Sequence, residues 1–138
     1  MKFIYIVFIV NFIFSEYVLD GYTLFTPQIG NPNAEVETKL VVNNLNDNGE
    51  CENDCEDIFH TWSHEYGPAS MPYLIQGDEP GLENTILVYP YRAPNPTMDS
   101  GGVGGGVQLV DWNSNVLWDF VLSNEQYQHH HDVEPMPN

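Results

Sequence analysis

Beyond residue 20 the hydrophobic positions come in short runs and not at helical spacing. No window keeps a 3.6-residue period for three turns, and 11 Gly and 10 Pro interrupt the chain. The runs are rich in Val, Ile, Leu, Tyr and Trp, as strands are. The sequence therefore predicts an all-β protein whose strands cover residues 22–25, 39–42, 58–62, 71–75, 85–89, 106–112 and 116–122.

Two pairs of these runs predict β-hairpins. Residues 73–75 lead through a turn rich in Gly, Asp and Pro into residues 86–88, and residues 108–112 lead through Asn-Ser-Asn into residues 116–120. Short strands joined by such turns form sandwiches, barrels or propellers. Trp62, Trp112 and Trp118 each fall at the end of a short run, and this periodic placement of aromatic residues favours a β-propeller.

Residues 1–15 have the pattern of a secretory signal peptide. Lys2 is followed by an apolar stretch from residue 3 to residue 14, and Ser15 is small. As a helix this stretch rises only about 18 Å, short of the roughly 30 Å core of a bilayer. We therefore expect a secreted or extracytoplasmic protein without stable membrane insertion, in which residues 16–138 form the domain.

The charge of the chain excludes several classes of partner. Outside the leader, Lys39 and Arg92 are the only basic residues, whereas the sequence has 20 acidic ones and a formal net charge of −17. Such a surface repels nucleic acids and anionic membranes. A nucleotide site also needs several Lys or Arg side chains around its phosphates, so we expect no nucleic acid partner and no nucleotide cofactor.

Cys51 and Cys55 lie in an acidic, polar segment. In an exported protein this pair predicts a local disulfide, with free thiols as the alternative, and C-x-x-x-C alone is not a zinc pattern. The preceding Asn44-x-Asn46-x-Asn48-Gly49 resembles a calcium-binding EF-hand loop, but its first position is Asn and its twelfth is Cys55 and not Glu.

The glycine-rich segment at residues 101–106 contains G-x-G but does not match a dinucleotide-binding loop. Its sixth position is Val107, and a strand follows it where the motif requires a helix. The segment instead predicts a tightly turning entry into the strand at Val107.

The residues with the most obvious chemistry are His129, His130, His131 and Asp132. On a regular strand His129 and His131 would share one face, and His130 and Asp132 the other, so the run cannot form a single three-histidine zinc site. A carboxylate beside histidines can fix the tautomer and orientation of a ring. Composition alone favours a functional site no more than a solvated end of a strand.

A longer set of motifs changes this balance. These are YTLFTP (22–27), TKLVV (38–42), HTW (60–62), PASMPYL (68–74), NTIL (84–87), GGVQ (105–108), DWN (111–113), VLWDF (116–120), HHDV (130–133) and PMPN (135–138). Together they resemble the N-terminal part of the arylsulfate sulfotransferase family. The resemblance covers most of residues 22–138, and its most specific part runs from DWN to PMPN.

The resemblance implies about the first two blades of a six-bladed β-propeller, truncated at the C-terminus. Two departures stand out: Asn-Ser-Asn at residues 113–115 replaces the family's Asp-Gly or Asn-Gly turn, and the loop around Cys51 and Cys55 looks like an insertion.

The resemblance also implies an activity. Family members transfer a sulfuryl group from an aryl sulfate to a phenol through a histidine intermediate, without a cofactor or a metal. The motif assigns catalytic roles to His131, the adjacent His130 and Asp132, and we expect this chain to be inactive alone. The alternatives are a secreted, non-catalytic propeller module that binds carbohydrate or protein, and a metal-dependent hydrolase that uses the histidine cluster.

Overall fold

The computed structural model describes residues 21–27, 36–43, 56–94, 96, 103–130 and 133–136. The described part is all-β, as the sequence predicts. Its one helical segment is a 3-10 turn of three residues, η1 (Leu82–Asn84). The strands are β1 (Tyr22–Phe25), β2 (Val36–Asn43), β3 (Glu56–His64), β4 (Tyr73–Gln76), β5 (Thr85–Arg92), β6 (Gly105–Val110) and β7 (Val116–Val121).

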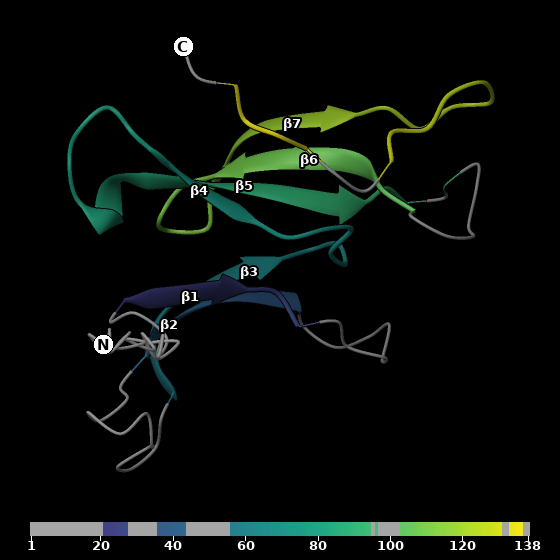
Figure 1. Cartoon of the computed structure of the whole chain (residues 1–138). Helices are drawn as coiled ribbons and strands as arrows, with labels where there is room; N and C mark the ends of the chain where they lie inside the picture. The colour runs from purple at the N-terminus through teal and green to yellow at the C-terminus, as the bar shows by residue number, and fades with distance from the viewer. Residues whose placement is uncertain are drawn as a thin grey trace, which may run out of the picture.

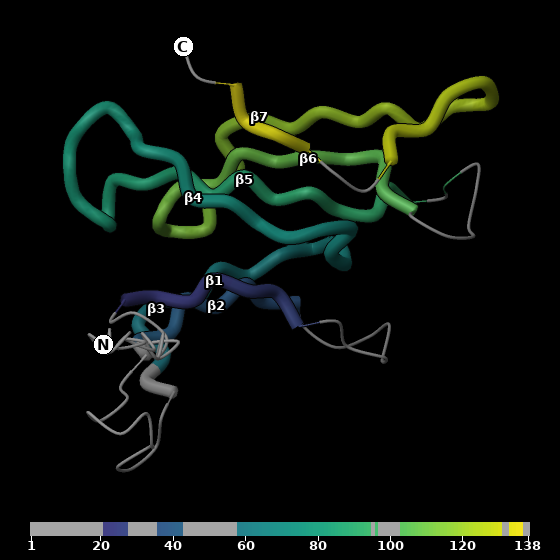
Figure 2. Tube along the Cα trace, in the orientation of Figure 1, coloured from purple at the N-terminus to yellow at the C-terminus, as the bar shows by residue number. Residues whose placement is uncertain are grey.

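The strands form two antiparallel sheets in which each strand pairs with the next one along the chain. The N-terminal sheet has the order β1-β2-β3 and the C-terminal sheet the order β4-β5-β6-β7. Figure 1 shows the two sheets stacked one above the other, with β4 and β5 nearest to the N-terminal sheet. Figure 2 shows each sheet as a continuous meander, and neither sheet closes on itself within the described residues.

The predicted signal peptide, the cysteine pair and the calcium-like segment lie outside the described residues. Both predicted hairpins are confirmed. In the first, Leu74 pairs with Leu87, and in the second, Leu109 pairs with Trp118.

The second hairpin turns around Asp111. One of its carboxylate oxygens accepts the backbone N–H groups of Asn113 and Asn115, both at 2.8 Å, and the other accepts the Asn115 side-chain amide at 2.9 Å. These bonds, led by that of the Asn115 side chain, hold the pKa of Asp111 below its usual value. Ser114 takes a φ of 64° in this turn, a region that favours Gly or Asn.

The predicted placement of the tryptophans at strand ends is wrong for two of them. Trp62 lies inside β3 and Trp118 in the middle of β7, while Trp112 lies in the β6–β7 turn. Trp62 lies inside its strand because β3 continues past it through polar residues to His64.

The strand predicted at residues 71–75 begins two residues later, at Tyr73. Gly67 and Ala69 bond to the strand residues Arg92 and Pro90, and regular pairing resumes only at Tyr73. Residues 70–72 leave the ladder between these two stretches, and Pro72 has no N–H to donate to it. The segment that links β3 to β4 therefore bulges away from the edge of the sheet.

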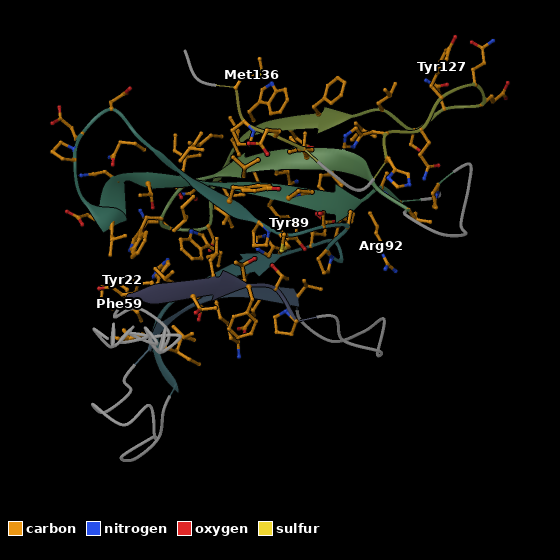
Figure 3. The ribbon with its side chains drawn as sticks, in the orientation of Figure 1. Tyr22, Phe59, Tyr89, Arg92, Tyr127 and Met136 are labelled. Atoms are coloured by element: carbon orange, nitrogen blue, oxygen red, sulfur yellow. The ribbon has the colours of Figure 1, made fainter. Side chains whose placement is uncertain are left out.

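The core lies between the two sheets. Its fully buried members are Leu40, Trp62, Leu87, Tyr89, Tyr91 and Val110. Figure 3 shows Tyr89 in the space between the sheets. β5 lies inside its sheet between β4 and β6, and nearly every one of its residues is buried. Burial of large aromatic side chains supplies the largest apolar areas in such a small core.

The last strand of the C-terminal sheet, β7, is much more exposed than the others. On β7, Trp118 and Phe120 are each about half exposed, at 48% and 46%. Their rings are parallel, with centroids 5.8 Å apart. Val116, Leu117 and Val121 of the same strand are exposed as well, so β7 presents apolar side chains to solvent along its whole length.

The start of β6 depends on the absence of side chains. Gly105 has a φ of 109°, and Gly106 pairs directly with Tyr91, whose ring lies flat over it. A Cβ atom on Gly106 would come within 2.2 Å of this ring. Gly105 and Gly106 thus form the beginning of β6 itself.

Gly106→Ala is therefore expected to lower the free energy of unfolding by about 1–3 kcal/mol, because the added methyl group displaces the buried Tyr91 ring. Gly67→Ala is the matched control: its Cβ would meet nothing within 4 Å, and we expect a change within about 0.5 kcal/mol. Urea denaturation of both variants checks this. Equal effects from the two substitutions would contradict the packing of Tyr91 on Gly106.

Candidate functional site

His129 and His130 of the predicted histidine run lie on an arm that returns beside the end of β7. The arm turns at Asn124, whose side-chain oxygen accepts the backbone N–H groups of Gln126 and Tyr127, both at 2.9 Å. Figure 3 shows Tyr127 at the tip of this arm. His129 then donates its backbone N–H to the Leu122 carbonyl at 2.8 Å.

Of the three predicted catalytic residues, the structure describes only His130, which is exposed. His131 and Asp132 lie outside the described residues. His129 and His130 themselves are not in a strand, so the alternation of faces predicted for a regular strand does not apply to them.

The two basic side chains of the described part do not converge on the histidine arm. Arg92 is exposed at the end of β5, where Figure 3 shows it pointing away from the sheets. Lys39 lies on β2 beside Glu37, with 3.6 Å between its nitrogen and a carboxylate oxygen. Among the described residues, no group of three or more His, Cys, Asp or Glu side chains could hold a metal ion.

Polar and aromatic side chains instead lie together where the two sheets pack on each other. On β3, His60, Trp62 and His64 occupy alternate positions and therefore share one face, which points toward the C-terminal sheet. Trp62 is fully buried and donates its indole N–H to the Asp111 carbonyl at 3.0 Å. This bond ties β3 to the β6–β7 turn.

His60 contacts the same turn. Its ring stacks on Trp112 with centroids 3.8 Å apart and planes 12° from parallel. Its Nε2 atom donates to the Trp112 carbonyl at 2.8 Å, which places a proton on that nitrogen. Around this contact, Tyr22 and Phe59 form an exposed aromatic edge with centroids 5.1 Å apart, and Figure 3 shows them together at one end of the N-terminal sheet.

His64 is the most strongly perturbed histidine of the described part. Its ring lies flat on Tyr89, with centroids 3.6 Å apart, and its Nε2 atom is 2.8 Å from the hydroxyl of the fully buried Thr38. Burial lowers the pKa of His64 to about 4. At neutral pH His64 is therefore an uncharged imidazole that can either donate or accept a hydrogen bond.

A second polar group surrounds Tyr91. Its hydroxyl donates to an Asp119 carboxylate oxygen at 2.7 Å, and the Gln108 side chain reaches the other oxygen at 3.3 Å. Burial, followed by the bond to Asp119, raises the pKa of Tyr91. The neighbouring Tyr89 hydroxyl donates to the Tyr66 carbonyl at 2.7 Å, and burial raises its pKa too. Both tyrosines are thus held as neutral hydrogen-bond donors.

Sequence analysis did not single out His64 or its partners. The signal that could have found His64 is the alternation of aromatic rings at residues 60, 62 and 64, which places three of them on one face of a strand. Its partners Thr38 and Tyr89 lie 26 and 25 residues away and on different strands, so local patterns do not reveal them.

Comparison with protein-family models, with curated proteins and with solved structures finds no match for this chain. The resemblance to arylsulfate sulfotransferases therefore depends on the sequence motifs themselves. Within the described residues, no helix is long and apolar enough to cross a membrane.

The depressed pKa of His64 predicts a dependence of stability on pH. The unfolded chain takes up a proton at His64 near pH 6.5, whereas the folded chain resists protonation down to about pH 4. Between these values the unfolded state binds more protons, so stability falls as the pH falls. From pH 6.5 to pH 4.5 this group should cost about 2 kcal/mol of stability.

Urea denaturation at several pH values measures this contribution by difference. His64→Gln should lose the extra acid sensitivity between pH 6.5 and pH 4.5, while His130→Gln, at an exposed position, should keep it. If all three proteins respond to acid identically, His64 is not buried in its neutral form.

Proposed function

We propose that this chain forms two neighbouring blades of a secreted β-propeller of the arylsulfate sulfotransferase type. Propeller blades are antiparallel meanders that pack face against face around a central axis. Both sheets here are such meanders, and they pack through the core that contains Trp62 and Tyr89. The open apolar face that includes Trp118 and Phe120 is suited to packing against a further blade.

One observation carries the proposal. The segments HTW (60–62) and DWN (111–113), on which the family resemblance partly depends, meet in a single junction although they are about 50 residues apart. Trp62 bonds to the Asp111 carbonyl, and His60 stacks on Trp112. A shared structural role for both segments explains why the two motifs occur together.

The proposed reaction has two steps and needs no cofactor. In the first, an imidazole nitrogen of a histidine attacks the sulfur of an aryl sulfate, the bond from sulfur to the aryl oxygen breaks, and a phenolate leaves. His131 serves either as this nucleophile or as an acid–base group beside it. In the second, the hydroxyl of an acceptor phenol loses its proton and attacks the same sulfur, which frees the histidine. His130 assists as a neighbouring donor or base, and Asp132 orients an imidazole ring.

Sulfuryl transfer also needs positive groups that stabilise the oxygens on sulfur. Arg92 and Lys39 do not converge on the histidine arm in the described part, as the geometry above shows. We therefore propose that other blades supply these groups and that the two blades alone do not transfer sulfuryl groups.

The second candidate is a secreted, non-catalytic propeller module. The observation that favours it is that the described histidines His60 and His64 serve the packing of the sheets and not an open reaction site. A propeller fold does not itself imply catalysis.

Activity toward 4-nitrophenyl sulfate with phenol as acceptor separates the two candidates in a protein that carries a full set of blades. His131→Ala should lower turnover by at least about a hundredfold, because a nucleophile or an acid–base group is lost. Asp132→Asn should lower turnover by a smaller factor, since the Asp132 carboxylate only orients an imidazole ring.

His129→Ala is the control and should keep most of the activity. Near-normal turnover in His131→Ala would move the chemistry to another residue, and no turnover by the unaltered protein would favour the binding module.

A further inference from the structure

A small pocket lies where the end of β1 meets the segment that links β3 to β4. Its volume is about 320 Å³, and it is lined by Leu24, Phe25, Thr26, Pro68, Ala69, Ser70, Met71 and Pro72. Pockets that hold small molecules begin at about 300 Å³ and combine apolar walls with a few polar groups. The size and the lining both fit this description.

The pocket exists because the pairing of the chain is interrupted there. Ala69 still bonds to the Pro90 carbonyl, but the next three residues leave the ladder before β4 begins at Tyr73. This bulge stands beside Thr26, directly after β1, and so provides one wall of the pocket.

The lining excludes charged ligands. None of the eight lining residues carries a charge, while the chain as a whole has a net charge of −17. An anion would be repelled and would find no cation to pair with. A buried cation would lose its hydration without gaining a carboxylate. The apolar side chains, among them Leu24, Phe25 and Pro72, instead favour the burial of an uncharged hydrocarbon ring.

Thr26 connects the pocket to the partly buried His64. The Thr26 and Thr38 hydroxyl oxygens are 2.6 Å apart, and the Thr38 oxygen is 2.8 Å from Nε2 of His64. Thr38 has one hydroxyl proton to give, so the chain has two arrangements. If His64 donates to Thr38, then Thr38 donates to Thr26, and the Thr26 proton points to a further acceptor. If His64 accepts, Thr26 donates to Thr38 and offers a lone pair.

We propose that this pocket binds an uncharged alcohol that carries a six-membered ring, with its hydroxyl bonded to Thr26. A hydroxyl both donates and accepts, so it satisfies Thr26 in either arrangement of the chain. A carbonyl oxygen only accepts hydrogen bonds, so it can bond to Thr26 only in the arrangement in which the Thr26 proton is available. This inference does not depend on sulfuryl transfer and concerns a site remote from His130 in the sequence.

Three probe molecules separate the contributions of the ring, the hydroxyl and the charge. Benzyl alcohol supplies the ring and the hydroxyl, toluene the ring alone, and benzoate the ring with a negative charge. In NMR titrations of the whole chain, benzyl alcohol should bind about three- to tenfold more tightly than toluene, as expected for one hydrogen bond. Benzoate should bind most weakly. The shifts should centre on Leu24, Thr26 and Ala69.

Variants identify the site and the bond. Thr26→Val keeps the shape but removes the hydroxyl, so benzyl alcohol should then bind no better than toluene. Thr23→Val, three residues earlier on β1 and paired with Val41, should leave both affinities unchanged. Ala69→Leu should fill the pocket and abolish binding of both probes, and its spectrum outside the pocket reports whether the chain remains folded.

Equal affinity for benzyl alcohol and toluene in the unaltered chain would overturn the role of Thr26. Shifts centred elsewhere, or no saturable binding of any probe, would overturn the site itself. Neither result would bear on the aryl sulfate assay, which tests the proposed function separately.

Discussion

The burial of Trp62 between the two sheets is the interaction on which the rest of the structure depends. Its side chain is fully buried, and its indole N–H would be costly to leave without an acceptor there. The Asp111 carbonyl satisfies it, but only if the β6–β7 turn reaches back to β3. The side-chain bonds of Asp111 that shape this turn therefore also serve the packing of one sheet on the other.

The packing of the two sheets on each other determines the protonation and the hydrogen bonding of the polar groups between them. The packing of the sheets presses His64 against Tyr89 and removes it from water, which keeps the imidazole neutral. A neutral imidazole can end a chain of hydroxyl groups in either direction, and that chain leads through Thr38 to Thr26 at the edge of the pocket. The chemistry at this edge is thus a consequence of how the sheets pack.

Much of the fold could be predicted from the sequence because short local patterns of residues indicate strands. Short runs of β-branched and aromatic residues located every strand of the described part, and the turn residues located both hairpins. The boundaries were less accurate where polar residues extend a strand, as at His64, and where pairing is interrupted, as at Met71. The interior site could not be predicted, since Thr38, His64 and Tyr89 are brought together only by pairing and packing across distant strands.

The exchange of the tryptophan indole N–H groups with solvent tests this account most directly. Trp62 is fully buried and bonded to the Asp111 carbonyl, whereas Trp118 is 48% exposed on β7. In deuterated water the Trp62 indole signal should persist long after that of Trp118 has vanished, because exchange at Trp62 requires the sheets to separate. Equally fast exchange at both positions would show that the two sheets are not packed through Trp62.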